Sequence, residues 1–101
     1  MSFNGLTDIL KKVRERYPAL SKRMDEAQAV NRWELAVGPT IAKYSRALRV
    51  QETTLWVEVD HPAWQSELHH RKHQIMQILN DKLDPAHQLQ DILFINSRTQ
   101  R

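Results

Sequence analysis

The sequence contains no cysteine and only two glycines among its 101 residues. The absence of cysteine excludes disulfide bonds, thiolate metal ligands and a cysteine nucleophile. Two isolated glycines, Gly5 and Gly38, are too few for a glycine-rich loop that cradles phosphate groups, and no nucleophile-elbow motif occurs. We therefore expect no catalytic residues, no metal and no cofactor, and predict that the protein is not an enzyme.

Long apolar runs are also missing, because no stretch approaches the roughly 20 residues that a membrane-spanning helix requires. Residues 1–8 lack the basic-then-apolar pattern of a secretory signal. We therefore expect no membrane partner and a cytoplasmic location. The chain has the length of one ordinary domain, so we predict a single domain over residues 1–101, structured over about residues 6–96, with a frayed tail at residues 97–101.

Charge is distributed unevenly along the chain, whose formal net charge is +3. Residues 1–50 carry ten Lys and Arg against five Asp and Glu, whereas residues 51–101 carry five against seven. A one-sided basic surface is typical of phosphate binding, although a solvated helix face gives the same pattern. The candidate contacts to a DNA or RNA backbone are Lys11, Lys12, Arg14, Arg16, Lys22, Arg23, Lys43, Arg46 and Arg49.

Hydrophobic periodicity predicts the secondary structure. Apolar residues at helical spacing predict a first helix over residues 7–16, which Pro18 ends. A second predicted helix covers residues 19–37 and is closed by Gly38 and Pro39, a pairing typical of helix C-termini. Two N-terminal helices are therefore expected to precede the rest of the fold.

From residue 46 the hydrophobic period changes to two. This pattern predicts an antiparallel hairpin of strands 46–51 and 55–60, joined without glycine. Pro62 suits the first turn of a long helix that should run to about Leu83, and residues 90–96 have the composition of a third strand. The predicted fold class is therefore α+β, with helices packed on one face of a three-stranded sheet.

The two faces of the predicted sheet differ in composition. The outward face would carry Trp56, Leu93 and Ile95, which makes it less polar than an open face normally is. Either the first helix covers this face, or the face binds a partner. The inward face is predicted to hold Leu48, Val50, Leu55, Val57, Val59, Ile92 and Phe94.

Three histidines and an arginine are notable on the predicted long helix. His69 and His73 would share a helix face, as helical zinc ligands do. A wheel of about 100° per residue places them opposite the apolar stripe that begins at Trp64, and nothing nearby completes a metal site, so we predict that they and His70 are surface charge. Arg71 falls within the stripe, where it either extends its head group past the sheet, pairs with an acidic group, or contacts a partner or a phosphate.

Five short motifs follow one another along the chain. They are Trp33-Glu34-x-x-Val37-Gly38-x-x-Ile41-Ala42, Leu55-x-Val57-x-Val59, Trp64-x-x-Glu67-Leu68, Ile75-x-x-x-Leu79-Asn80 and Ile92-x-Phe94. The ordered series resembles the DciA-like family of bacterial proteins over roughly residues 6–96. The resemblance implies a fold similar to K-homology domains and service in DNA replication, where DciA-type proteins engage the replicative helicase DnaB and help place it on DNA. The glycine-x-x-glycine loop with which K-homology domains clamp a backbone is missing from this chain.

Three hypotheses follow for the function. In the first, the protein binds a DnaB-type replicative helicase and helps load it on DNA, with weak binding of single-stranded or forked DNA. In the second, it is a stand-alone RNA- or single-stranded-DNA-binding module, monomeric or homodimeric, in which Trp56 stacks on bases. In the third, the outward face mediates only self-association. The candidate partner-binding residues are Trp64, Trp56 and Arg71.

Overall fold

The computed structural model describes residues 5–97, so the predicted frayed end at residues 98–101 lies outside the described part of the chain. The side chain of Arg14, one of the candidate phosphate contacts, also lies outside it. The elements are, in order, α1 (Gly5–Arg16), α2 (Pro18–Asn31), α3 (Trp33–Val37), α4 (Pro39–Ala42), β1 (Ser45–Gln51), β2 (Thr54–Val59), α5 (Pro62–His70), α6 (Lys72–Asn80), the 3₁₀ turn η1 (Pro85–His87) and β3 (Asp91–Asn96).

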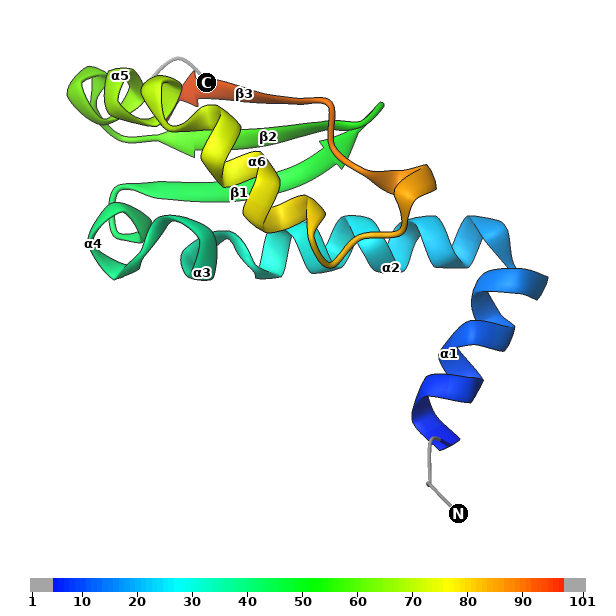
Figure 1. Ribbon diagram of the computed structural model, residues 1–101. Coiled ribbons are helices and arrows are strands. Elements are labelled where there is room, and N and C mark those ends of the chain that lie inside the picture. Colours follow the sequence, from blue (N-terminus) through cyan, green and yellow to red (C-terminus); the bar gives the residue numbers. More distant parts are fainter. Residues whose placement is uncertain (1–4, 98–101) are drawn as a thin grey trace.

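The three strands form one sheet in the order β1-β2-β3. Strands β1 and β2 form the predicted antiparallel hairpin, and β3 lies parallel to β2 on its other side. The third strand runs parallel because α5 and α6 carry the chain back along the sheet before β3 begins (Figure 1). The α+β fold class predicted from the sequence is confirmed.

Strand β1 contains a bulge that corrects the predicted inward face. Ala47 pairs with Val57 and Arg49 pairs with Trp56, so Leu48 is the extra residue between them. A bulge reverses the alternation of side chains on one side of itself. Ala47 is therefore buried and Leu48 only partly buried, which makes the prediction of Leu48 as an inward-facing strand residue wrong.

The hairpin turn uses residues that disfavour its backbone conformation. Glu52 and Thr53 have φ of 51° and 62°, both in the left-handed region. Two-residue hairpin turns require this conformation because it matches the twist of the strands. A β-branched threonine rarely adopts it, and the main-chain hydrogen bond from Gln90 to the Thr53 carbonyl oxygen, at 2.8 Å, helps to hold it there.

Both long predicted helices are interrupted at an arginine. The second predicted helix is divided into α2 and α3 at Arg32 (φ −94°, ψ 6°), and the long helix into α5 and α6 at Arg71 (φ −97°, ψ 4°). No glycine or proline marks either position. The break at Arg71 changes the direction of the helix axis, whereas α3 continues nearly along the line of α2 (Figure 1). Apolar residues on both sides of each break belong to the same core.

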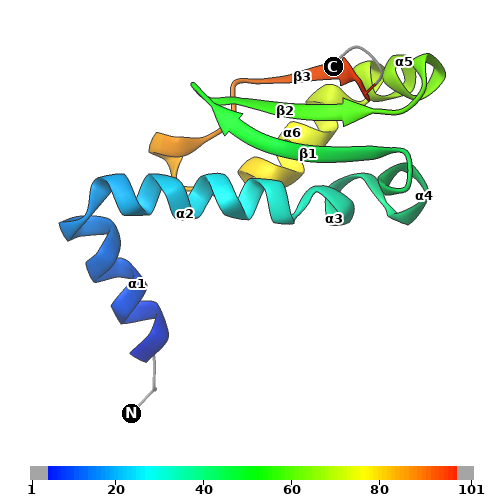
Figure 2. The same ribbon diagram turned by 180° about the vertical axis from the view of Figure 1, so that it is seen from behind.

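The core lies between the sheet and the helices on one of its faces. Helices α5 and α6 lie over that face, and α2 runs beside β1 (Figure 1). Figure 2, which shows the molecule from behind, has no helix over the opposite face, and α1 extends away from the sheet. Within residues 5–97, no helix is both long and apolar enough to cross a membrane. The buried apolar residues include Trp33, Ile41, Leu55, Val57, Val59, Leu68, Ile75, Leu79, Ile92 and Phe94.

Two hydrogen-bonded contacts join distant segments inside this core. The indole N–H of Trp33 donates to the hydroxyl of Ser45 at 2.9 Å, and that hydroxyl donates to the carbonyl oxygen of Ile41 at 2.9 Å. The side-chain amide of Asn80 donates to the Leu89 carbonyl oxygen at 3.0 Å and accepts from the Leu89 N–H at 2.7 Å. Such pairing removes the cost of burying these polar groups.

Candidate nucleic-acid interface

Trp56 lies at the middle of the uncovered sheet face. It belongs to the central strand β2, and its register partners are Arg49 on β1 and Leu93 on β3. The guanidinium carbon of Arg49 lies 4.7 Å from the Trp56 ring centroid, which is the geometry of a cation–π contact. The bulge at Leu48 creates this pair, because without it Arg49 would not lie opposite Trp56.

The sequence left two accounts of the outward face open, and the structure excludes the first, cover by α1. Helix α1 does not cover it (Figure 2). Leu93 is 39% exposed, and together with Trp56 it lines a shallow hollow of about 300 Å³ at the hairpin end of the sheet. The face therefore carries a partly exposed aromatic ring and a leucine beside a cation, and the hollow is also lined by polar residues that include Glu52 and Asp91.

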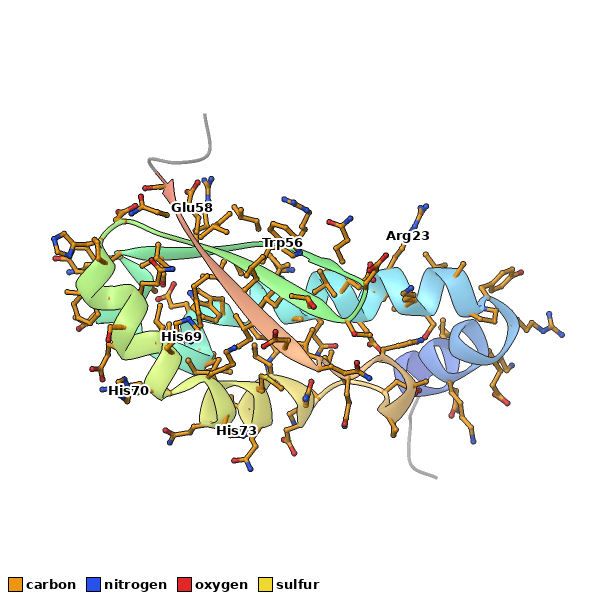
Figure 3. The ribbon with its side chains drawn as sticks, turned by 90° about the horizontal axis from the view of Figure 1, so that it is seen from above. Arg23, Trp56, Glu58, His69, His70 and His73 are labelled. Atoms are coloured by element: carbon orange, nitrogen blue, oxygen red, sulfur yellow. The ribbon has the colours of Figure 1, made fainter. Side chains whose placement is uncertain are left out.

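A groove runs along the outer side of β1, between this strand and α2. We call it the β1 groove. One part, of about 350 Å³, is lined by apolar residues that include Val30 and Leu48 and by the charged residues Arg23, Glu26 and Arg49. An adjoining part of about 330 Å³ shares Val30 and continues to Arg46. Figure 3 shows Arg23, Trp56 and Glu58 on the same side of the molecule, so the groove and the uncovered face adjoin.

The structure brings some of the candidate phosphate contacts together and separates others. Arg23, Arg46 and Arg49 line the β1 groove, and Lys43 lies beside Arg46 at the end near α4. Arg46 also donates to Glu58 at 3.4 Å, with its own side chain 73% exposed. Lys22 lines a neighbouring hollow that shares Glu26 and Val50 with the groove. The remaining candidate cations with described side chains are exposed at α1, away from the groove: Lys11, Lys12 and Arg16.

Trp64 forms part of a second aromatic surface. Its ring stacks on that of Tyr44, with centroids 5.3 Å apart and planes 11° from parallel. Trp64 is partly buried against the core, whereas Tyr44 is 41% exposed. Tyr44 follows α4 and Trp64 belongs to α5, and both helices lie at the end of the sheet opposite the hairpin turn (Figure 1).

Arg71 does not lie within the apolar stripe, so that prediction from the helical wheel is wrong. The break between α5 and α6 turns Arg71 outward, where Nε donates to Glu67 at 2.7 Å and the side chain is 51% exposed. A wheel that assumes one straight helix fails beyond such a break. The sequence allowed Arg71 to extend past the sheet, to pair with an acidic group or to contact a partner. In the structure it pairs with the acidic group of Glu67.

His69 and His70 contact different neighbours. No group of three or more metal-ligating side chains occurs among the described residues. His69 contacts the edge of Phe94, with ring centroids 5.2 Å apart, and Nδ1 of His70 lies 3.0 Å from the Ser66 carbonyl oxygen. Figure 3 shows His70 and His73 on the side away from Trp56, so they add no charge to the uncovered face.

Sequence reasoning missed Tyr44 and the contact between Arg49 and Trp56. Tyr44 precedes β1 in a turn, where no periodicity indicates which way it points. The contact between Arg49 and Trp56 depends on the bulge, and the alternating pattern of residues 46–51 gave no sign of it. Trp56 was recognisable as an outward residue from the alternation of its strand, whereas Trp33 is buried in the core.

The fold and these surfaces define a class: a small α+β protein with a mixed three-stranded sheet, a cationic groove beside its edge strand and two separate aromatic surfaces. A family model described as "Dna[CI] antecedent, DciA" matches residues 5–94. The chain belongs to the DciA family, which confirms the resemblance seen in the sequence. Membership supports a replication-related role in a bacterium.

One curated relative is a UPF0232 protein of Corynebacterium glutamicum (strain R). It is 32% identical over 53 residues, which make up 52% of this chain and 30% of the relative. The matched segment thus spans less than a third of the relative's length.

Proposed function

We propose that the protein is a non-enzymatic accessory factor of a DnaB-type replicative helicase, which it binds and helps to load on DNA. The observation that carries the proposal is the match to the DciA family over residues 5–94. The geometry adds two surfaces, an aromatic one at the end of the sheet near α4 and a groove with three arginines along β1. A factor that brings a helicase to DNA needs one surface for each of them.

The aromatic surface formed by Tyr44 and Trp64 is the proposed helicase contact. Tyrosine and tryptophan supply large, rigid contact areas, and both are enriched among the residues that dominate interface energies. Trp64 rests on the core and holds Tyr44 in place by stacking. The exposed Tyr44 ring would make the direct contact, with Trp64 as its support.

The β1 groove is the proposed DNA contact. Arg23, Arg46 and Arg49 come from two different elements, and the fold gathers them on one side of the molecule. Phosphate contacts of this kind supply affinity without sequence preference, which suits weak binding of single-stranded or forked DNA. The K-homology-like fold stays a prediction, supported by the mixed three-stranded sheet and the helices on one face.

Capture of the purified cognate helicase by the immobilised protein tests the helicase contact. Tyr44→Ala is expected to reduce capture by at least about tenfold, as expected for a residue at the centre of an interface. Tyr17→Ala is the matched control, because Tyr17 is 56% exposed and lies between α1 and α2. Absence of a wild-type complex, or equal loss in both variants, would contradict the proposal.

A second candidate is a stand-alone module for RNA or single-stranded DNA, and one observation favours it. Trp56 is accessible on the uncovered face with a cation beside it, an arrangement that suits base stacking without any helicase. The capture experiment separates the two candidates, because only the first requires a stable complex with the helicase.

A further inference from the structure

The uncovered sheet face has a composition that a solvent-exposed face does not require. Three register partners cross it in one row, namely Arg49, Trp56 and Leu93. Trp56 and Leu93 line the same hollow of about 300 Å³, and no helix covers this face of the sheet (Figure 2). One part of the Trp56 ring contacts Arg49 and another borders the hollow.

The cations next to this row are not neutralised. Among residues 5–97, neither Arg23 nor Arg49 forms an ion pair, and Arg46 is paired with Glu58 only at 3.4 Å. Arg49 is held over Trp56 by the ring and by its Nε–H, which donates to the Gln51 side chain at 3.5 Å. Two cations without an ion pair, Arg23 and Arg49, therefore lie on the β1 side of the face, although Glu26 lines the same part of the groove. At the far edge Asp91 is already bound to Lys72.

We propose that this face is a base-stacking site for single-stranded DNA: an unpaired base occupies the hollow against Trp56, and the flanking phosphates lie along Arg23, Arg46 and Arg49. The inference rests on the proposed contact with DNA and adds the site and the form of the ligand. Aromatic rings and guanidinium planes are the surfaces on which unpaired bases stack. A duplex cannot use the site, because its bases are already stacked on one another.

The unpaired cations and the aromatic ring suit this occupant. A strand of DNA supplies negative charge for Arg23 and Arg49 and a planar ring for Trp56. Carboxylates also line these hollows, namely Glu26 in the β1 groove and Glu52 and Asp91 beside Trp56. A second copy of the chain would bring these carboxylates to the same cations, so self-association is measured as a separate outcome.

Binding of a labelled thymidine oligonucleotide about ten nucleotides long, within the site size of small single-strand-binding folds, tests the inference. An abasic strand with the same number of phosphates and a duplex of equal length are measured beside it. The wild type is expected to bind the thymidine strand about 5- to 150-fold more tightly than the abasic strand, the contribution of one stacked base. The duplex should show no such gain.

Two matched variants assign the gain to Trp56. Trp56→Leu retains apolar area and strand propensity but has no aromatic ring, so it should bind both single strands with the abasic affinity. Trp56→Phe retains a smaller ring and should keep part of the difference in affinity between the thymidine and abasic strands.

The Arg23→Gln variant tests the phosphate contact. It should weaken binding of both single strands while preserving the ratio of their affinities. Unfolding curves check that each variant is folded, and the phenylalanine variant carries the test if the leucine variant is not.

Four results would overturn the inference. They are a wild type that does not distinguish the two strands, a Trp56→Leu variant with unchanged preference, tighter binding of RNA of the same sequence, and self-association that Trp56→Leu abolishes in light scattering. Because no helicase is present, failure here is distinct from failure of the capture experiment. The protein can fail to bind the helicase and still stack a base, or bind the helicase and fail to stack a base.

Discussion

Asp25 of α2 accepts a hydrogen bond from Nδ1 of His87, 2.7 Å away, although the Asp25 side chain is only 1% exposed. The same carboxylate oxygen accepts the main-chain N–H of Asp84 at 3.3 Å. These hydrogen bonds therefore connect α2, which borders the β1 groove, to η1. The η1 turn in turn leads into β3. A carboxylate this deeply buried is stable only when it is hydrogen-bonded in this way.

Replacement of Asp25 by alanine should destabilise the protein strongly. Asp25→Ala leaves a buried N–H of Asp84 and the His87 ring without this partner, so we expect a loss of about 2–4 kcal/mol in the free energy of unfolding. Urea denaturation followed by circular dichroism measures it. Glu26→Ala, one position further along α2, should change stability by less than about 0.5 kcal/mol. Similar losses in the two variants would show that the buried contact is unimportant.

The contact between Trp33 and Ser45 should behave as a coupled pair. Ser45→Ala removes the acceptor of a buried indole N–H, and we expect it to cost about 1–3 kcal/mol. Trp33→Phe removes the donor instead. Because both changes break the same hydrogen bond, the double variant should lose less stability than the two single losses added together. Strict additivity in a denaturation cycle would contradict the pairing.

Relief of backbone strain should make the hairpin turn more stable. Thr53 has φ of 62°, where its side chain is disfavoured, so Thr53→Gly should raise the free energy of unfolding by about 1 kcal/mol. Thr54→Gly is the control: Thr54 begins β2, and glycine inside a strand should cost about 0.5–1 kcal/mol. Opposite signs for neighbouring threonines are expected in thermal unfolding. A loss at both positions would show that the Thr53 side chain outweighs its strain.

The pair of Lys72 and Asp91 should contribute a small pH dependence. The hydrogen bond from Lys72 lowers the pKa of Asp91 below its usual value of 3.8, helped by the main-chain N–H of Ile92. The Asp91 carboxylate therefore binds a proton more readily in the unfolded chain than in the folded one. Its contribution to the free energy of unfolding is complete above about pH 4 to 5 and is lost as the pH falls through the folded pKa. It should be modest, because Asp91 is 55% exposed.

Removal of the Lys72 charge tests the cause of this shift. Lys72→Gln should raise the pKa of Asp91 towards 3.8, measured from the carboxyl carbon by NMR titration. Lys82→Gln, in the turn after α6, removes an equal charge and should leave the pKa of Asp91 at its wild-type value. An unchanged titration in Lys72→Gln would assign the shift to the Ile92 N–H instead.

Phosphate contacts in the β1 groove should contribute to the salt dependence of DNA binding. Arg23→Gln removes one proposed phosphate contact, so the slope of log affinity against log salt should fall by about one. Affinity should drop to a similar extent for every sequence tested. Lys82→Gln again serves as the control and should keep the wild-type slope. Equal slopes in both variants and the wild type would place the phosphate path elsewhere.

Much of the architecture could be predicted because it depends on local periodicity. Alternation in residues 55–59 identifies a strand that is buried on one face, since any other register would expose Val57 and Val59. Pro18, Pro39 and Pro62 mark helix boundaries through the lack of an N–H. These signals depend only on residues that are close in sequence, so they do not require knowledge of the tertiary contacts.

The candidate site was predicted less completely. Trp56 was recognised as an outward residue, and Arg23, Arg46 and Arg49 as part of a basic half of the chain. Their association in one groove was not visible, because it depends on how α2 lies beside β1. Lys11, Lys12 and Arg16 have the same sequence character and yet lie away from the groove.

The sequence by itself determined the order of helices and strands, the composition of the core and the family, since all three are recorded in residue type and spacing. The tertiary structure alone decided where the helices bend, that Leu48 bulges and that Arg49 therefore meets Trp56. The physical reason is that breaks at Arg32 and Arg71 and the bulge cost little locally and are stabilised by packing against distant residues. Which side chains share a surface is a property of that packing.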